Sequence, residues 1–244
     1  MSTRVHATVI VAGLAALAAC DATLSSHGDI YSRGADHLVL CSQNIDDSYG
    51  IGVPEIADAL DRADGDGTTL HLYTHTPGET IAMTALEGVL AAVADRHMQF
   101  ATYSDLNAGE VPGSLALAFD DDSVAEWTAI RPLLDRYNAR VTFFISGFLR
   151  FDDDTRAQIQ QLADDGHDIE YHSTNHLDAV AYSMAAGMDA YLADDIVPAL
   201  DAMRAAGHAT PIFAYPGGAR NDATDAALSQ YFTHLRAIRS TCPR

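Results

Sequence analysis

The stretch SLALAFDDDSVAEWTAIRPLLDRYNARVTFFIS, residues 114–146, decides the fold class. It opens with an apolar run of strand length and closes with a run of β-branched and aromatic residues, RVTFFIS at 140–146. Between these runs, Ser123 and Glu126 have the spacing of a capping box, which predicts a helix that begins there. A strand, a helix and a second strand in this order predict a parallel βαβ unit.

The same alternation extends to both sides of this unit. We expect helices over 80–97, 154–165 and 184–206, and strands over 69–75, 100–106, 167–171, 211–215 and 233–238. The segment NAGEVPGS, 107–114, is rich in Gly, Asn and Pro and is expected to be a loop. Alternation over this length predicts parallel βαβ units, and a single α/β barrel is a normal outcome for a chain of this size. In such a barrel, functional residues gather at the C-terminal ends of the strands.

Composition limits the size of the fold and the class of partner. The 244 residues are 48% hydrophobic, which is enough for one domain with a sizeable core. The formal net charge is −20, and all 14 basic residues are Arg. This balance argues against nucleic acid or an anionic membrane surface as a partner, because phosphate binding needs clustered cations.

The N-terminus has the pattern of an export signal. A basic start at Arg4 precedes an apolar run, 7–19, that is too short to span a bilayer. The run ends in Leu-Ala-Ala-Cys at 17–20, which resembles a lipobox with Cys20 as the acylated residue. We therefore expect a lipoprotein signal peptide over 1–20, a polar tether over 21–36, and an exported, membrane-anchored protein that faces the periplasm or cell surface. The alternative is a plain signal peptide cleaved after small residues.

Three polar clusters directly follow expected strands: DDD at 120–122, HSTNH at 172–176 and YPGG at 215–218. His172 and His176 are four residues apart, a spacing that on a helical turn puts two imidazoles on one face to bind a divalent ion. An aspartate at a neighbouring strand end can supply a third ligand while the next aspartate acts as a general base. The alternatives are an ordinary polar loop and a solvated turn, and we assign the latter role to Asp122.

In order and spacing, these clusters resemble the first three motifs of the polysaccharide deacetylases, carbohydrate esterase family 4 with its NodB-homology domain. The matching segments are Phe119-Asp120-Asp121, HSTNH at 172–176 and FAYPGG at 213–218. The resemblance implies a distorted (β/α)7-8 barrel. It also implies a set of roles: Asp120 as the general base, Asp121, His172 and His176 as metal ligands, the Gly217 N–H as an oxyanion donor, and Tyr215, Pro216 and Gly218 along the substrate cleft. Zinc is the first choice of metal, with cobalt, nickel or manganese as alternatives.

The family's last motif, a strand that ends in a histidine acting as the general acid, is found here near the N-terminus, at LHLYTH with His75. The resemblance therefore implies a circularly permuted domain over 37–244, in which 37–108 matches the family's C-terminal part and 113–244 its N-terminal part. Domain termini often lie close together, which makes such a rearrangement tolerable. The new chain ends would then bring Cys41 and Cys242 together as a disulfide, with two free thiols as the alternative.

The resemblance leaves two partners open. The family's third motif usually carries an Arg that orients the catalytic Asp, whereas this chain has Ala214 or Tyr215 there. Arg220 and Arg150 are candidates to replace that Arg. The acidic partner of His75 is expected at position 46 or 47, both of which are aspartates, and Trp127 is expected in the core rather than as a sugar platform.

The function implied by the resemblance is metal-dependent removal of acetyl groups from a cell-wall or extracellular polysaccharide. N-acetyl groups are the first choice and O-acetyl groups the second. One alternative is a catalytically weak or inactive surface lipoprotein of the same fold that binds glycan, which the absent motif Arg favours. Another is a deacylase for a small non-sugar amide. The sequence encodes neither the polymer nor the oligomeric state.

Overall fold

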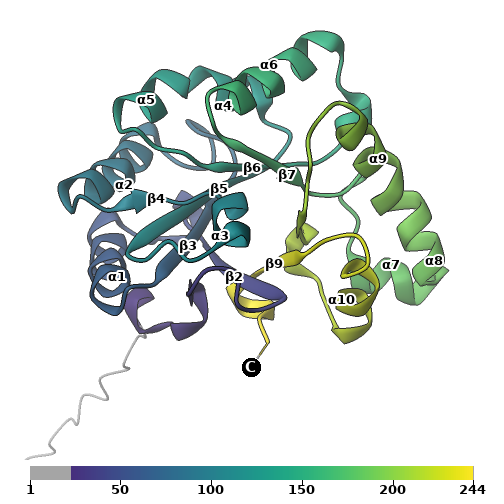
Figure 1. The fold of residues 1–244 in the computed structure, drawn as a ribbon, viewed down its shortest axis with the longest axis horizontal. Coiled ribbons are helices and arrows are strands. Elements are labelled where there is room, and N and C mark those ends of the chain that lie inside the picture. Colours follow the sequence, from purple (N-terminus) through teal and green to yellow (C-terminus); the bar gives the residue numbers. More distant parts are fainter. Residues whose placement is uncertain (1–22, 244) are drawn as a thin grey trace, which may run out of the picture.

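The computed structural model describes residues 23–243, which form a closed barrel of parallel strands surrounded by helices (Figure 1). The barrel strands are β2 (Val39–Asn44), β3 (Thr69–Thr74), β5 (Ser114–Asp121), β6 (Thr142–Ile145), β7 (Asp168–Tyr171), β8 (Ile212–Ala214) and β9 (His234–Ile238). They pair in the order β3-β2-β9-β8-β7-β6-β5, and β5 pairs in parallel with β3 to close the ring. The predicted α/β barrel of the deacetylase type is therefore confirmed.

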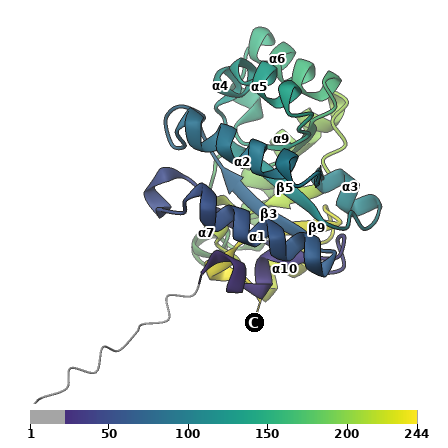
Figure 2. The same ribbon diagram turned by 90° about the vertical axis from the view of Figure 1, so that its left-hand side faces the viewer.

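Helices cover the outside of this barrel (Figures 1 and 2). They are α1 (Val53–Asp66), α2 (Met83–Asp95), α4 (Val124–Ala129), α5 (Arg131–Arg136), α6 (Asp153–Asp164), α7 (Ala179–Ala186), α8 (Met188–Tyr191), α9 (Val197–Ala205) and α10 (Asp222–Leu228). The short helix α3 (Tyr103–Ala108) contributes Tyr103 and Leu106 to the apolar cluster inside the barrel. Two short strands, β1 (Tyr31–Ser32) and β4 (Gln99–Phe100), pair with the beginnings of β3 and β5.

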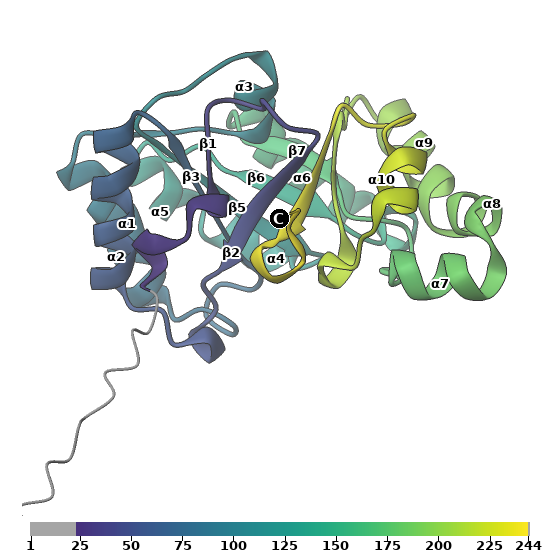
Figure 3. The ribbon, with the colours of Figure 1, turned by 90° about the horizontal axis from the view of Figure 1, so that it is seen from below.

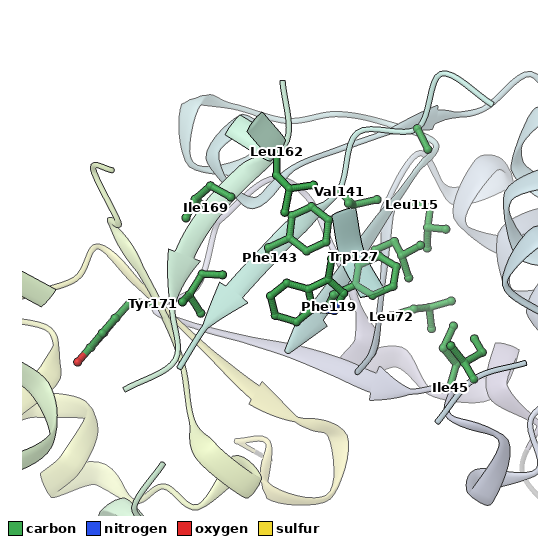
Figure 4. Close-up of a cluster of buried hydrophobic side chains, with 14 of the residues drawn as sticks. Ile45, Leu72, Leu115, Phe119, Trp127, Val141, Phe143, Leu162, Ile169 and Tyr171 are labelled. Atoms are coloured by element: carbon green, nitrogen blue, oxygen red, sulfur yellow. The ribbon is translucent and has the colours of Figure 1, made fainter. Parts of the chain in front are cut away.

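The main core lies between the barrel wall and the helices (Figure 4). Phe119 of β5 and Phe143 of β6 stack with their ring centroids 5.4 Å apart. The ring centroid of Trp127, on α4, lies 5.2 Å from that of Phe143. Trp127 is fully buried, so it is a core residue as expected and cannot serve as an exposed sugar platform. Burial of such aromatic side chains provides a large share of the hydrophobic free energy of folding.

Several predicted helices and strands differ from those observed. Residues 100–106, expected as one strand, contain only the end of β4 and then begin α3, where Thr102 and Asp105 form a capping box. The expected helix over 184–206 is wrong in both start and continuity: α7 begins at Ala179, Gly187 interrupts it, and a π-helical turn (Leu192–Ile196) precedes α9. The helix after Ser123 breaks at Ile130, between α4 and α5.

The predicted capping box at Ser123 and Glu126 is also wrong. Ser123 is the N-cap residue of α4, but its side chain makes no capping hydrogen bond. Its hydroxyl instead contacts the hydroxyl of Thr76 at 2.6 Å. A side-chain contact to the loop after β3 has replaced the local cap, so α4 is tied to the barrel at its first turn.

The expected polar tether packs on the domain over most of its length. Within 23–36, Leu24 and Ile30 are buried, and Tyr31 pairs with Leu70 of β3. These apolar residues cover part of the barrel wall, which explains why the segment is not extended away from it. The predicted signal peptide and the lipidation site Cys20 lie outside the described residues. Within residues 23–243, no helix has the length and apolar character that crossing a membrane requires.

A disulfide joins Cys41 on β2 to Cys242 near the C-terminus, with the two Cα atoms 5.9 Å apart. Figure 3 shows the C-terminal end of the described chain beside β2. Strand β9, which precedes Cys242, pairs in parallel with β2 from Val39 to Ser42. The bridge therefore ties the last strand of the chain to the first strand of the barrel.

Candidate active site

The strand register brings the polar clusters to one mouth of the barrel. Thr74 of β3 lies opposite Phe119 of β5, so the next residues, His75 and Asp120, lie side by side at the ends of these strands. Asp121 pairs with Ile145 of β6, whose carbonyl accepts the amide of His172 at 2.9 Å. Parallel strands thus deliver residues far apart in sequence to the same edge.

Asp121, His172 and His176 form a group of three potential metal ligands. One ligand atom from each lies within 4.8 Å of the others. Oδ1 of Asp121 is 3.1 Å from Nε2 of His176 and 3.4 Å from Nε2 of His172. Burial alone would raise the pKa of the Asp121 carboxyl, but the two imidazoles that face it, those of His172 and His176, hold that pKa far below its usual value.

This group fits a divalent metal ion. Nδ1 of His172 lies 2.8 Å from the carbonyl oxygen of Ala214, which leaves Nε2 free as a ligand when Nδ1 carries the proton. Oδ1 of Asp121 is buried and has no hydrogen-bond partner of normal geometry within the described chain, although two ring nitrogens face it. One carboxylate oxygen and two imidazole nitrogens form a donor set suited to zinc or a similar ion.

The two histidines do not share a helical turn, so that part of the prediction is wrong. HSTNH forms a loop in which Ser173 and His176 have positive φ values of 76° and 57°. The loop nevertheless places the two imidazole centroids 5.0 Å apart. Asp121 also has a positive φ, 88°, and its carbonyl accepts the amide of Ser146 at 2.8 Å. Non-glycine residues in this region usually mark strain that the surroundings hold in place.

Arg236 of β9 is the partner of Asp120, and sequence reasoning missed it. Its guanidinium forms an ion pair with Oδ2 of Asp120, and both side chains are almost completely buried. The guanidinium also lies over the rings of Tyr73, at 4.5 Å, and Phe144, at 5.1 Å. Oδ1 of Asp120 has no hydrogen-bond partner within residues 23–243, so one oxygen is fixed and the other is left free to accept a proton.

The two arginines considered for this role are engaged elsewhere. Arg220 binds Asp225 and Arg150 lies 3.5 Å from Asp122. Arg236 could have been noticed in the sequence, because a charged residue at the centre of the strand HLRAI is costly unless it is paired. Pairing Arg236 with Asp120 also needs the order of the strands around the barrel, which the sequence does not give.

His75 is held by Asp46, which decides between the two candidate acids. Nδ1 of His75 lies 2.5 Å from Oδ2 of Asp46, whereas Asp47 accepts the amide of Ala82 at the start of α2. Burial would raise the pKa of Asp46, but hydrogen bonds from His75 and from Thr74 lower it to about 2. The indole N–H of Trp127 donates to the carbonyl of His75 at 2.8 Å and fixes its backbone.

The electrostatics of His75 follow from the same neighbours. Burial lowers the pKa of the imidazole, but the hydrogen bond to Asp46 and the negative charges of Asp120 and Asp121 outweigh it, so the pKa lies above its usual value. These two aspartates act on His75 because β5, which carries them, and β3, which precedes His75, end at the same mouth of the barrel. The arrangement can hold a proton on His75 while Asp120 is positioned to accept one.

The segment YPGG is less open than expected. Tyr215 is 1% exposed and its hydroxyl donates to Asp225 at 2.8 Å, so its side chain is packed in the interior, and its place along the substrate cleft stays a prediction. Pro216 and Gly218 are buried as well, and a Cβ at Gly218 would clash with Ile238. Gly217 is exposed, with a φ of 58°, and remains the candidate oxyanion donor.

A family model described as polysaccharide deacetylase matches residues 109–233, more than half of the chain. The chain belongs to the polysaccharide deacetylase family. Its members are hydrolases, and the matched segment contains Asp120, Asp121, His172 and His176. A comparison with curated proteins gave no significant match.

Solved structures of deacetylases share the fold. A de-N-acetylase from Aggregatibacter actinomycetemcomitans is 17% identical, with a TM-score of 0.55 over 82% of this chain and 86% of that chain. The BpsB deacetylase domain from Bordetella bronchiseptica is 14% identical, with a TM-score of 0.51 over 63% of this chain and 83% of that chain. At these identities the likeness establishes the fold, and the roles of individual residues depend on the geometry above.

The ion pair of Asp120 and Arg236 predicts strong energetic coupling in this polysaccharide deacetylase. Arg236→Met should lower the free energy of unfolding by about 3–5 kcal/mol, because it leaves a buried carboxylate without a counter-charge. Adding Asp120→Asn should recover most of that loss. Urea unfolding of the two single variants and the double variant measures the coupling.

The partly exposed ion pair of Arg131 and Asp165 is the matched control. Replacing it by Met and Asn in the same design should give a coupling of about 1 kcal/mol or less. Simple additivity of the Asp120 and Arg236 substitutions would contradict the assignment of Arg236 as the partner that holds Asp120.

Proposed function

We propose that this protein is a metal-dependent deacetylase that hydrolyses acetyl groups, N-acetyl groups first, on a cell-wall or extracellular polysaccharide. One observation carries the proposal. The buried Asp120 carboxylate has one oxygen held by Arg236 and the other free, and it is the chain neighbour of Asp121, which faces two imidazoles. A general base beside a candidate metal site is the arrangement that hydrolysis of an amide requires.

Asp120 and Gly217 have separate tasks in this proposal. The free oxygen Oδ1 of Asp120 accepts the proton of the attacking water, while Arg236 keeps the carboxylate oriented. The exposed Gly217 N–H donates a hydrogen bond to the oxyanion that develops on the acetyl group. A divalent ion on Asp121, His172 and His176, zinc first and cobalt, nickel or manganese as alternatives, supplies Lewis-acid activation of the water and the carbonyl when bound.

His75 is the proposed general acid. Its Nδ1 is directed to Asp46, so Nε2 is the atom that carries the proton to the departing amine. The raised pKa of His75 keeps the ring protonated over more of the neutral range than an isolated histidine. An amine is a poor leaving group without a proton, which is why this acid favours N-acetyl over O-acetyl substrates.

Two alternatives have different support. A glycan-binding protein without turnover was favoured by the absent motif Arg, and Arg236 weakens that argument because it supplies the same charge from β9. A deacylase for a small non-sugar amide would use the same residues. The family supports an acetylated polysaccharide as the substrate class.

The domain organisation and location are also proposals. The family model begins at residue 109, yet β2 and β3, which complete the barrel, and His75 all precede it. This order supports a circularly permuted domain over 37–244, with NAGEVPGS joining the two parts. The sequence pattern at 1–20 supports export and a lipid anchor at Cys20, with the domain outside the cytoplasm.

Acetate release from an N-acetylated chito-oligosaccharide tests the proposed chemistry. We expect activity that a chelator abolishes and zinc restores. Asp120→Asn should lower kcat by about 10²–10⁴-fold through loss of the base while the protein still binds one metal ion. Asp122→Asn, which changes the neighbouring exposed carboxylate, should change kcat by about 2-fold or less. Full activity of the Asp120 variant, or release that the chelator does not affect, would refute the proposal.

The pH profile tests His75. Activity should fall as the pH rises through the pKa of His75, because the acid must be protonated. Asp46→Asn removes a negative charge and a hydrogen bond that raise this pKa, so the alkaline limb of the kcat/KM profile should move to lower pH. Asp47→Asn is the matched control and should leave the limb in place. An unmoved limb in the Asp46 variant would show that another group sets it.

A further inference from the structure

Asp195 is a buried carboxylate with no ion-pair partner within residues 23–243. It lies in the π-helical turn Leu192–Ile196, between α8 and α9, and its side chain and backbone are 0% exposed. A buried charge without a counter-ion is costly and needs several hydrogen bonds to be tolerated. The hydrogen bonds that Asp195 accepts from other parts of the described chain come from Tyr171 at the end of β7, from the HSTNH loop and from Leu177 directly after it.

Asp195 accepts three backbone amides, two from that loop and one from the residue directly after it. Oδ1 accepts the amide of Asn175 at 2.5 Å, Oδ2 accepts that of Leu177 at 3.3 Å, and the carbonyl oxygen accepts that of Thr174 at 2.8 Å. The one remaining amide in this run, that of His176, donates to Oγ of Ser173 at 2.8 Å. The four consecutive amides from Thr174 to Leu177 therefore have fixed acceptors, and Asp195 provides three of these acceptors.

This attachment explains how the loop keeps its conformation. Ser173 and His176 both have positive φ values, which non-glycine residues keep only where the surroundings specify them. Because Asn175 and Leu177 flank His176, the carboxylate of Asp195 fixes the backbone on both sides of it. The imidazole of His176, whose side chain is 46% exposed, is thereby directed to Asp121, with Nε2 3.1 Å from Oδ1.

The π-helical turn makes further contacts with the end of β7. The carbonyl oxygens of Asp195 and Ile196 both lie within hydrogen-bond distance of the Tyr171 hydroxyl, at 2.9 and 2.8 Å. The loop also binds the start of α9, where the amide of Ala199 donates to Oγ1 of Thr174 at 3.2 Å. Turns of this type often occur where a helix adapts to a functional site.

We propose that Asp195 is a positioning residue that holds the HSTNH loop in its ligand-ready conformation before metal binds, and so sets the metal affinity of the site. This inference rests on the proposed metal-dependent function. A carboxylate suits the task because both oxygens accept N–H groups, whereas an amide of the same shape would direct a donor at one of them. The inference concerns the loop backbone and assigns Asp195 no contact with substrate.

Metal affinity measured by competition with a chromophoric chelator tests the role of Asp195. We expect the wild-type protein to bind one equivalent of zinc or cobalt, and Asp195→Asn to bind about 10–100-fold more weakly, with an altered visible spectrum of the bound cobalt. Asp194→Asn is the matched control, since its exposed side chain accepts a hydrogen bond from Tyr182 and, within residues 23–243, none from the HSTNH loop, and it should stay within about 2-fold of wild type. An Asp195 variant with wild-type affinity and spectrum would overturn this inference and leave the proposed function standing. Failure of the wild-type protein to bind metal would overturn the proposed function and the inference with it.

Hydrogen exchange of the wild-type protein gives a second readout that does not depend on a variant folding. The amides of Thr174, Asn175 and Leu177 should be protected from exchange already in the metal-free protein, because their acceptors belong to Asp195. Amides that exchange freely without metal and become protected only when metal is added would show that the ion organises the loop, which would overturn the inference.

Discussion

The parallel pairing of β3 with β5 is the constraint on which the whole site depends. It joins a strand from before the family-matched segment to the first strand within that segment, and thereby closes the barrel. Its register places His75 beside Asp120 at the strand ends. A slip of one residue would turn the side chains of one strand to the opposite face, and Asp120 would leave the barrel interior. The candidate acid and base are therefore neighbours because of backbone hydrogen bonds between two strands.

Charge balance inside the barrel imposes a second condition. A guanidinium buried among Tyr73, Phe144 and small apolar residues requires a counter-charge, and Asp120 supplies it. The same ion pair restrains the carboxylate to one orientation and leaves one oxygen free. Stability and the proposed chemistry thus depend on one interaction, and the Asp46–His75 pair repeats this arrangement at the adjacent strand end.

The sequence predicted the barrel and the set of polar residues at its mouth, because strand-to-helix alternation and polar clusters at strand ends are local patterns. It did not predict contacts that depend on the order of strands around the ring, of which Arg236 with Asp120 is the clearest. It also misread residues 100–106, where aromatic and β-branched residues suggested a strand although Thr102 and Asp105 carried a capping signal for α3. Two buried side chains, Leu24 and Ile30, turned an expected tether into part of the packed domain.

The helix after the HSTNH loop shows why local patterns were insufficient there. Continuous helical character over 184–206 gave no sign of the π-helical turn, whose geometry is fixed by tertiary hydrogen bonds from Tyr171 and the loop. Nothing in the sequence distinguishes Asp195 from the other acidic residues of a chain with a net charge of −20. Its burial and the three amides that it accepts depend on tertiary contacts of the π-helical turn with the end of β7 and the loop that follows it.

Anomalous diffraction from crystals soaked in zinc is the most direct test of the convergence of these segments on one ion. The account predicts a single strong peak about 2.0–2.2 Å from a carboxylate oxygen of Asp121 and from Nε2 of both His172 and His176. Zinc bound elsewhere, or no peak between these three side chains at saturating zinc, would contradict it.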